Sequence, residues 1–372
     1  MPSAYTHPTY IFNNQTGFLY NPYLSSNSHL ILDFNLNNHQ TKYLVKPSED
    51  FYSPFSEAEI TNIIQTLETR REIPLKYSYK GRGAKIWNNY YMKYIVTRWY
   101  RRANLENSFL KANLSYIDGT YQNCEKVNII DIGSGNSHPI KELITQLNKT
   151  GKINKYIALD ISDSLLQISQ KNFSKWFPNI DYTHSTIDIE NGEIDQELLK
   201  SSTNIKTANI FLHLGVTIGN HQNRIQVFKN LRNSMSKKDL LIFTNEIGSN
   251  SQWDGFARGA YKYQAEQIYK WIKDKIGILS QDCELIRKYD LPTDSIVANI
   301  KFKRHYTINF SRQQTSKKIH LLPGDEITIW RHHKCQMSEL TQEMEQAGLK
   351  LVHHTTNQYQ SHVMVICQIS EN

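Results

Sequence analysis

A glycine-containing turn follows an apolar run near the middle of the sequence. Residues 128–132 read Asn-Ile-Ile-Asp-Ile, and Gly133, Ser134 and Gly135 come directly after them. Glycines let the backbone turn tightly and approach a ligand, and a helix that follows offers free N–H groups at its start. The dinucleotide fingerprint needs a third glycine where this chain has His138. The turn therefore predicts a site for a smaller, nucleoside-type ligand.

Carboxylates stand at or just after the ends of three strand candidates. Asp131 lies in the first strand candidate, residues 127–132, and Asp160 is the last residue of the second, residues 156–160. Asp188 comes directly after Ile187, just beyond a third strand candidate that ends near Thr186. In a parallel sheet these ends share one edge, where Asp160 could accept two hydrogen bonds from a ribose diol. Asp188 could accept the N–H of an adenine amino group. The ordered set predicts a site for S-adenosylmethionine, although each carboxylate taken alone could equally cap a helix.

The elements that must position these residues alternate between strands and helices. Short apolar runs predict strands, and amphipathic stretches between them predict helices. The expected strands are residues 127–132, 156–160, 210–214 and 240–244, and the expected helices lie near residues 139–147, 164–176 and 224–234. This alternation predicts βαβ units and an α/β fold with a mostly parallel sheet.

The segments on either side of this region have other patterns. Residues 1–50 are rich in Asn, Ser, Tyr and Pro and predict an irregular arm, with extended runs at 30–32 and 43–45. Ser56 and Glu59 predict a capping box at the start of a helix. The remaining expected elements are a helix over 84–102, helix over 249–291, strands over 295–308 and 318–330, and a helix over 341–348.

The composition limits the kinds of protein that this chain can be. Its 372 residues suffice for two domains, and the 39% of hydrophobic residues can bury a core, which excludes wholesale disorder. No apolar run approaches the roughly 20 residues of a membrane-spanning helix, and the first thirty residues lack a signal-peptide pattern. We therefore expect a cytoplasmic protein. The four widely spaced cysteines predict reduced thiols rather than disulfides.

Four segments, in order, resemble the signatures of one enzyme family. Residues 74–84 read Pro-Leu-Lys-Tyr-Ser-Tyr-Lys-Gly-Arg-Gly-Ala, residues 94–98 read Tyr-Ile-Val-Thr-Arg, and residues 214–220 read Leu-Gly-Val-Thr-Ile-Gly-Asn. The fourth matching segment, residues 159–162, reads Leu-Asp-Ile-Ser and follows the glycine turn, between residues 98 and 214. Over residues 55–370 the chain resembles the histidine Nα-methyltransferases of ergothioneine biosynthesis, a family that includes fungal relatives acting on a prenylated tryptophan.

This resemblance implies a fold and a division into domains. The fold class would be α/β. The chain would contain a class I (Rossmann-like) methyltransferase domain and a second, α+β domain that binds the substrate. The implied boundaries are an irregular arm at 1–50, a helical part of the substrate-binding domain at 51–110, the S-adenosylmethionine-binding methyltransferase domain at 111–248, and the rest of the substrate-binding domain at 249–372.

The resemblance also implies which residues bind each ligand. Asn220 matches the asparagine that binds the substrate's amino-acid group, and Tyr94 and Tyr261 are the counterparts of pocket tyrosines, so these three are the candidate catalytic and substrate-binding residues. The candidate cofactor-binding residues are a loop that closes over S-adenosylmethionine (Tyr79, Gly81, Arg82 and Gly83) and the strand-end residues Asp131, Gly133, Ser134, Gly135, Asp160, Ile187 and Asp188.

Elementary chemistry agrees with an asparagine and tyrosines at such a site. Methylation of an amine needs a neutral lone pair aimed at the sulfonium methyl group, so positioning supplies most of the catalysis. Asn220 could orient the amine through its side-chain oxygen, while a tyrosine hydroxyl steadies a carboxylate or relays the lost proton. The alternative for Tyr94 and Tyr261 is ordinary aromatic packing.

The sequence departs from the family pattern where the substrate side chain would bind. The family carries a glutamate and a serine that grip the imidazole of histidine, and Trp330 and His332 stand at those positions. An imidazole N–H buried without its acceptor costs roughly 1–3 kcal/mol. Lys80 also replaces a usual carboxylate in the first signature. We therefore expect Trp330 and His332 to bind a larger, aromatic or anionic side chain.

Several alternatives to this interpretation remain. The favoured activity is N-methylation of an amino acid or a derived small molecule. The alternatives are histidine Nα-methylation, nucleic-acid methylation, and a non-catalytic role as a protein that only binds S-adenosylmethionine or a partner. The net charge of +8 favours nucleic acid only weakly, and Asn21-Pro22-Tyr23 lies far from the strand end where a nucleic-acid methyltransferase motif belongs. We expect a small-molecule amine substrate and a monomer, with no nucleic-acid or membrane partner.

No metal site is expected from the paired histidines. His332 and His333 are adjacent, as are His353 and His354, and adjacent residues of a strand point to opposite faces. Such pairs cannot both reach one ion, so we expect solvated or singly packed side chains there.

Overall fold

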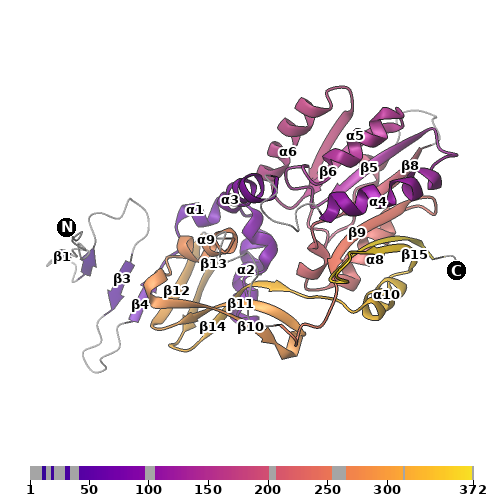
Figure 1. Cartoon of the computed structure of the whole chain (residues 1–372). Helices are drawn as coiled ribbons and strands as arrows, with labels where there is room; N and C mark the ends of the chain where they lie inside the picture. Colours follow the sequence, from indigo (N-terminus) through magenta and orange to yellow (C-terminus); the bar gives the residue numbers. More distant parts are fainter. Residues whose placement is uncertain are drawn as a thin grey trace, which may run out of the picture. The chain divides into compact units, whose positions relative to one another are not determined.

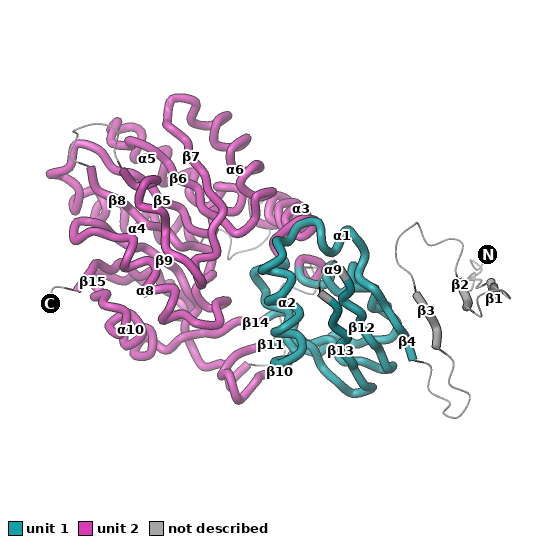
Figure 2. The backbone as a smooth tube through the Cα atoms, turned by 180° about the vertical axis from the view of Figure 1, so that it is seen from behind, with its two compact units in different colours: residues 1–78, 269–288, 297–330 teal, residues 79–268, 289–296, 331–372 magenta. Residues whose placement is uncertain are grey.

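The computed structural model describes residues 42–96, 105–200, 207–253, 265–312 and 315–370, with three short strands before residue 42. The chain divides into two compact units, which Figure 2 colours separately. Unit 1 comprises residues 1–78, 269–288 and 297–330, and unit 2 comprises residues 79–268, 289–296 and 331–372. Each unit therefore contains segments that are far apart in the sequence.

Unit 2 contains a seven-stranded sheet among its described residues (Figure 1). Across the sheet the order is β15 (Leu349–Thr356), β16 (His362–Ile369), β9 (Leu240–Glu246), β8 (Thr207–His213), β5 (Lys126–Ile132), β6 (Ile153–Asp160) and β7 (Asp181–Thr186). Strands β5 to β9 are parallel, whereas β16 pairs antiparallel with β9 and with β15. This is the predicted α/β fold with a Rossmann-like sheet, and the class I prediction is confirmed.

The order of the strands creates a switch point beside β5. The chain runs outward from β5 to β6 and β7 and then returns to the other side of β5 with β8. In open parallel sheets, ligands bind at the carboxyl ends of the strands where the order reverses. The glycine turn after β5 and the segment after β8 therefore lie at the edge where a ligand is expected.

Helices cover both faces of the sheet because its central strands β5, β8 and β9 are largely buried and apolar on both sides. Along β5, Ile129 packs in one core cluster and Ile130 in the other, as the period of two residues requires. The first cluster includes side chains of α4 (Leu105–Thr120), α5 (Lys141–Lys149) and α6 (Asp163–Trp176), and the second includes side chains of α7 (Gln196–Leu199), α8 (Arg224–Ser234) and α10 (Met337–Gln346). Three further helical segments of this region are α3 (Arg82–Tyr90), the π-helical turn η2 (Tyr91–Val96) and the 3₁₀ turn η4 (Thr217–Asn220).

Unit 1 has its own strands and helices. A four-stranded sheet has the order β13 (Thr315–Leu321), β12 (His305–Arg312), β4 (Lys42–Val45) and β3 (Leu30–Asp33), and β4 runs parallel to β12. A three-stranded sheet has the order β10 (Cys283–Asp290), β11 (Ser295–Phe302) and β14 (Glu326–His332), and β1 (Ile11–Asn13) pairs with β2 (Phe18–Tyr20). The helical elements are α1 (Glu49–Tyr52), α2 (Glu57–Arg70), η1 (Leu75–Tyr79), α9 (Gln267–Ile276) and η5 (Ser280–Asp282), whereas the short turn η6 (Leu291–Thr293) belongs to unit 2.

The local start of α2 follows the sequence closely. The Ser56 hydroxyl accepts the Glu59 N–H, and the Glu59 carboxylate accepts the Ser56 N–H at 2.8 Å. This reciprocal capping box confirms the predicted helix start.

Two expected elements differ from the structure. Residues 283–290, predicted as part of a helical region, form β10, because they pair in a sheet with β11 instead of extending α9. The helix expected over 84–102 is α3 followed by the π-helical turn η2, and residues 97–104 lie outside the described part of the chain. Among the helices that the structure describes, none has the length and apolar character needed to cross a membrane.

Candidate active site

The glycine loop, residues 133–137, turns sharply over the neighbouring strand. The N–H groups of Gly133 and Ser134 both donate to the Leu159 carbonyl, at 2.8 and 3.1 Å. Gly133 and Gly135 have φ angles of +70° and +54°. A Cβ atom on Gly135 would lie 2.5 Å from Cη2 of Trp87, so glycine is required both by the backbone and by this close contact.

Asp160 links the glycine loop to the end of β6. One carboxylate oxygen accepts the Gly135 N–H and the other accepts the Ser162 N–H, both at 2.9 Å. Burial raises the pKa of Asp160 to about 6, against the lowering effect of these backbone hydrogen bonds. A carboxylate has about four acceptor positions, so each oxygen retains capacity for a further donor such as a hydroxyl.

Asp131 accepts the last hydrogen bond in a chain of hydrogen-bonded hydroxyl groups. The Tyr156 hydroxyl donates to Asp131 Oδ2 at 2.7 Å, so Ser137 must donate to Tyr156, at 2.8 Å. Ser169 contacts Ser137 at 2.5 Å and Tyr182 at 2.9 Å and continues the chain. Burial raises the pKa of Asp131 to about 7. The chain holds this carboxylate in one orientation beside the glycine loop.

The segment after β7 lies next to Asp160. Ile187 donates its N–H to the Asp160 carbonyl at 2.9 Å. The Asp188 carboxylate accepts the Asn191 side-chain amide at 2.7 Å and the Glu190 N–H at 3.3 Å. Asp188 therefore stabilises the turn in which it lies, and its side chain is only half-buried.

The helix α3, which begins within the predicted closing loop, contacts the glycine loop through two residues that are not among the predicted site residues. Trp87 lies against Gly135, and the Asn88 side-chain oxygen accepts the Asn136 amide at 2.9 Å. Both belong to α3, which Gly81 precedes with a φ angle of +51°. The only sequence signal for Trp87 and Asn88 is that they follow the Gly-Arg-Gly signature on the same short helix.

The other predicted residues of this loop vary in exposure. Gly83 is buried, Tyr79 and Gly81 are half-buried, and Arg82 is exposed. Tyr94, the expected pocket tyrosine, lies in η2 and packs against Tyr90 with ring centroids 5.4 Å apart. Tyr261 lies outside the described residues.

The 3₁₀ turn that carries Asn220 is tightly enclosed in unit 2. The Gly219 N–H donates to the Asn245 side-chain oxygen at 3.1 Å, and the Gly219 carbonyl accepts the His333 N–H at 2.7 Å. A Cβ atom on Gly219 would lie 2.4 Å from the His333 carbonyl oxygen and 2.6 Å from the His332 ring. Only glycine fits here, and its contacts fix the backbone next to Asn220.

Three side chains form the Asn220 cluster, which we define as Asn220, His332 and Glu246. Nδ1 of His332 lies 3.0 Å from Oδ1 of Asn220, and Nε2 of the same ring lies 3.8 Å from Oε2 of Glu246. His332 and Glu246 are both buried. The structure thus brings Asn220 and His332 together. Glu246 was missed, although it ends β9 as Asp160 ends β6, and the same strand-end signal could have found it.

A pair of histidines lies beside the glycine loop and was also missed. His213 ends β8, and its Nδ1–H donates to the Ile132 carbonyl at 2.9 Å. Its Nε2 lies 3.0 Å from Nε2 of His221, so His221 is the donor in that contact. Burial, with the nearby His221, lowers the pKa of His213 to about 3. His213 is therefore neutral and supports the backbone from which the loop begins.

Trp330 and His333 have surroundings of their own. Trp330 belongs to unit 1, where its ring lies 6.5 Å from that of Tyr269. His333 contacts Glu339 at 2.8 Å, whereas His332 contacts Asn220, so the two neighbours point to opposite sides as expected.

Three potential metal ligands lie within 4.8 Å of one another in the described part of unit 2: His333, Cys335 and Glu339. The Arg224 guanidinium lies 2.7 Å from the same Glu339 oxygen that contacts His333. Burial raises the pKa of Cys335 to about 12, so its sulfur is a thiol at neutral pH. A cation would have to displace an arginine and deprotonate this thiol. The group fits a hydrogen-bonded structural cluster.

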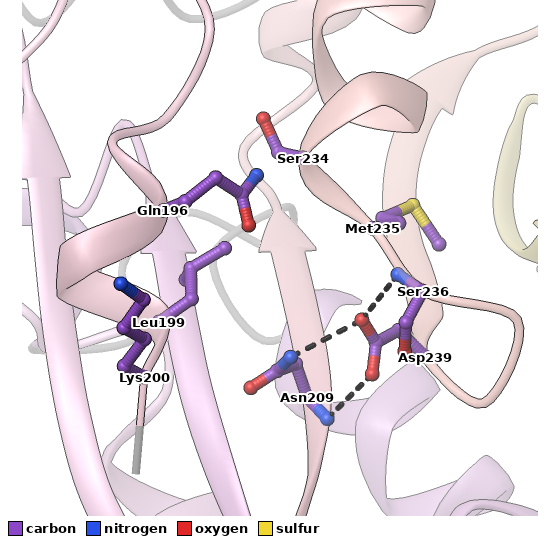
Figure 3. A pocket seen from close by; sticks show the side chains of 8 residues that line it. All are labelled: Gln196, Leu199, Lys200, Asn209, Ser234, Met235, Ser236 and Asp239. Atoms are coloured by element: carbon purple, nitrogen blue, oxygen red, sulfur yellow. Dashed lines mark hydrogen bonds between the residues drawn. The ribbon is translucent and has the colours of Figure 1, made fainter. Parts of the chain in front are cut away.

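A small surface cavity at the opposite edge of the sheet does not belong to this site. It is lined by residues near the beginnings of β8 and β9, among them Asn209 and Asp239 (Figure 3). The Asp239 carboxylate accepts the Asn209 N–H and side-chain amide and the Ser236 N–H, at 2.7–3.1 Å. These contacts engage the Asp239 carboxylate within the protein.

Comparison with protein families decides the class of this chain. The model of the histidine-specific, S-adenosylmethionine-dependent methyltransferases matches residues 59–369. The chain belongs to this family. Its cofactor is accordingly S-adenosylmethionine, and the protein is a methyltransferase, as the sequence predicted.

Three solved structures are similar to this chain at low sequence identity and low TM-score. A Clostridium acetobutylicum S-adenosylmethionine-dependent methyltransferase has 10% identity and a TM-score of 0.41, over 77% of this chain and 99% of its own. A Pyrococcus horikoshii protein has 12% identity and a TM-score of 0.41, over 73% of this chain and 92% of its own. The glycopeptide N-methyltransferase MtfA has 11% identity and a TM-score of 0.37, over 68% and 86%. Among curated proteins, none matches the chain significantly.

The glycine loop of this methyltransferase fits a nucleoside ligand. Within the described residues, the buried Ser134 hydroxyl has no hydrogen-bond partner, and a buried polar group usually finds one. Asp160 beside it retains acceptor capacity. A hydroxyl-rich ribose offers both the donors and the acceptors that these two groups need.

Proposed function

We propose that this methyltransferase methylates the amine of an amino acid, or of a small molecule derived from one, and that free histidine is not its preferred substrate. The observation that carries the proposal is the contact between His332 and Asn220. Nδ1 of His332 is engaged with the asparagine expected to bind the amine, and its Nε2 side faces Glu246. The Nδ1 side of His332 is thereby engaged within the protein.

Free histidine would then lack its two expected contacts. The family pattern grips the imidazole through a glutamate and a serine, both of which can accept a hydrogen bond. The indole of Trp330 is a donor only, and His332 is engaged with Asn220. An imidazole N–H left without an acceptor loses roughly 1–3 kcal/mol, or about 5- to 150-fold in affinity. An aromatic or larger side chain loses nothing comparable.

The proposed cofactor contacts lie around the glycine loop. Asp160 would accept the ribose hydroxyls, Asp131 would face the positively charged part of the cofactor, and Asp188 with Ile187 would border the adenine. The loop residues Tyr79, Gly81, Arg82, Gly83, Gly133, Ser134 and Gly135 complete the proposed cofactor-binding set. S-adenosylmethionine supplies an electrophilic methyl group on a sulfonium centre.

The remaining work of the protein is positioning the amine. Asn220 would hold the amino-acid group so that the nitrogen lone pair points along the transfer direction, and Tyr94 and Tyr261 would complete that pocket. A thioether leaving group needs no general acid, so no acidic side chain is required there. The amine must lose its proton before transfer, which favours activity at neutral or higher pH.

A substrate panel tests this proposal. The purified protein is incubated with S-adenosylmethionine and with histidine, tryptophan, tyrosine, phenylalanine, their derivatives and biogenic amines, and mass spectrometry counts the added methyl groups. We expect an aromatic or larger amine to be methylated at least tenfold faster than histidine. Equal or faster methylation of histidine would overturn the substrate proposal and establish histidine Nα-methylation, the runner-up that the family supports.

The same assay separates the remaining partner classes. A monomer acting on a small amine should turn over at rates that depend weakly on salt, because no phosphate backbone is bound. A steep loss of activity between 50 and 200 mM salt, appearing only with nucleic acid present, would contradict this expectation.

A further inference from the structure

The contact between Asn220 and His332 has a defined direction. Oδ1 of Asn220 is an amide oxygen and can only accept, so the proton lies on Nδ1 of His332, 3.0 Å away. The Asn220 side chain is therefore held through one acceptor position of its oxygen, and the second acceptor position of that oxygen remains for an N–H of the amine. Without this contact, the two ends of the amide are nearly equal in shape and could exchange.

Close packing fixes the positions of Asn220 and His332 relative to each other. The His332 ring lies 2.6 Å from the place that a Cβ atom on Gly219 would occupy, so the ring rests against the backbone of the turn. The His333 N–H holds the Gly219 carbonyl from the same side at 2.7 Å. The turn and residues 332–333 therefore cannot slide apart without breaking several contacts.

Glu246 favours the ring state that this contact needs. Its carboxylate lies 3.8 Å from Nε2 of His332, 3.5 Å from Nε2 of His362 and 3.9 Å from Nζ of Lys334. A negative charge on the Nε2 side favours the protonated ring. A protonated ring always carries hydrogen on Nδ1, so Glu246 supports the donor that faces Asn220.

We propose that His332 is a positioning residue, which with Glu246 behind it fixes the orientation of the Asn220 amide toward the amine substrate. The inference deepens the proposed function and rests on it only in taking Asn220 as the amine-binding residue. It assigns His332 a role through Asn220 and not as a group that touches the substrate side chain. It also gives Glu246 a function that the sequence did not suggest.

Three substitutions of His332 separate this role from simple packing. His332→Asn keeps a side-chain N–H near the position of Nδ1, His332→Gln places one near the position of Nε2, and His332→Ala removes both. With the best amine of the panel, we expect His332→Ala and His332→Gln to lower kcat/KM roughly 10- to 100-fold. His332→Asn should retain activity to within about fivefold.

The cofactor and a neighbouring histidine provide the controls. The Kd of S-adenosylhomocysteine, measured by calorimetry, should stay within about twofold of wild type in all three variants. His333→Asn changes the adjacent histidine that points to Glu339, and it should lower the Tm while leaving KM for the amine unchanged. Equal losses in His332→Asn and His332→Ala, or unchanged kinetics in His332→Ala, would overturn the proposal.

A double-mutant cycle tests the part played by Glu246. Glu246→Gln should lower kcat/KM in the wild-type protein but add little in the His332→Ala background, because its effect passes through the ring. Fully additive losses would show that Glu246 acts independently of His332 and would remove it from the proposal.

A spectroscopic measurement distinguishes failure of this inference from failure of the proposed function. In ¹⁵N-labelled protein, the imidazole nitrogens of His332 report directly whether Nδ1 carries the proton, with no substrate present. We expect a protonated Nδ1 in wild type. In Glu246→Gln we expect the ring to lose its Nε2 proton more readily and to keep the Nδ1 proton, because the Asn220 oxygen still accepts it. An unprotonated Nδ1 in wild type would overturn the inference even if an amine is methylated. A protonated Nδ1 with no methylated amine would sink the proposed function alone.

Discussion

The glycine loop and the Asn220 cluster follow neighbouring strands of one sheet, but different parts of the chain hold them. The loop is held mainly by backbone groups, since Gly133 and Ser134 donate to Leu159, and Asp160 accepts the Gly135 N–H. The Asn220 cluster is held by side chains from three distant segments, which end at residues 220, 246 and 332. A backbone-built site tolerates changes in sequence, whereas a side-chain-built site changes its specificity with each substitution.

The largest expected effects separate the two regions by what each one binds. Asp160→Ala removes the acceptors proposed for the ribose and should raise the Kd of S-adenosylhomocysteine by roughly 100-fold or more. Asn220→Ala should leave that Kd within about twofold and lower kcat/KM by roughly 100-fold. Calorimetry and steady-state kinetics measure the two quantities on the same samples.

Asp188→Ala serves as the matched control for Asp160→Ala. The Asp188 carboxylate is half-buried and shapes its own turn, so its loss should weaken binding less than tenfold. Normal turnover in Asn220→Ala would show that the amine is bound elsewhere, and the contrast between the two regions would disappear.

The two regions also differ in how far the sequence could predict them. The glycine turn, Asp131 and Asp160 come from one pattern of apolar runs, glycines and strand-end carboxylates, and the sheet that positions them follows from the same alternation. Trp87 could not be found this way, because its contact with Gly135 depends on how α3 packs on the loop. The contact between Asn220 and His332 spans 112 positions of the chain, so no local pattern contains it.

Non-local pairing also explains the elements that were wrong. The residues of β10 were assigned to a helical region because apolar residues in the preceding segment follow a helical period. Their pairing with β11, which decides their structure, is a tertiary effect. By contrast, the start of α2 depends only on Ser56 and Glu59, which are three residues apart in one turn, and it was predicted correctly.

Adding one methyl group to a glycine in each region should sharpen the comparison. Gly135→Ala places a Cβ atom 2.5 Å from Trp87 at a φ angle of +54°, and it should raise the Kd of S-adenosylhomocysteine by about tenfold or more. Gly219→Ala places a Cβ atom 2.4 Å from the His333 carbonyl, and it should raise KM for the amine by a similar factor.

A second substitution shows whether these effects arise from the named contacts. Trp87→Ala opens space beside Gly135, so the Gly135→Ala/Trp87→Ala protein should bind the cofactor product more tightly than Gly135→Ala alone. The Cβ atom of Gly219→Ala meets the backbone carbonyl of His333, so no side-chain substitution can relieve that contact. If both glycine variants changed the same kinetic constant, the two regions would not be functionally separate.

Cofactor affinity should fall as the pH falls, and the carboxylates of Asp131 and Asp160 set the pH range over which it falls. The pKa values of Asp131 and Asp160 are raised by burial to about 7 and about 6. A ligand that donates hydrogen bonds or positive charge binds the ionised forms, so protonation competes with it. We expect the Kd to rise up to tenfold per pH unit between about pH 7 and 6, and more steeply below pH 6.

Variants assign the two parts of this pH dependence. Asp131→Asn should flatten the Kd between about pH 7 and 6 and leave a rise of up to tenfold per pH unit below pH 6, which comes from Asp160 alone. Titrations of S-adenosylhomocysteine from pH 5 to 8 measure both. A Kd that is constant over this range in wild type would show that neither carboxylate faces the ligand.

The smallest expected effect concerns stability and not binding, and it arises where the two regions meet at the end of β8. His213 has its pKa lowered by burial to about 3, from an ordinary value of 6.5, so the folded state favours the neutral ring. The stability from this group is complete above about pH 6.5 and is lost as the pH falls toward 3, by about 1.4 kcal/mol per pH unit.

His213→Asn keeps a donor for the Ile132 carbonyl without the titration. Its Tm should therefore fall less than that of wild type on acidification, by about 2–4 °C per pH unit, as differential scanning calorimetry between pH 7 and 5 can measure. Parallel Tm curves for the two proteins would mean that His213 is accessible to protons in the folded state, and the loop would then be supported from elsewhere.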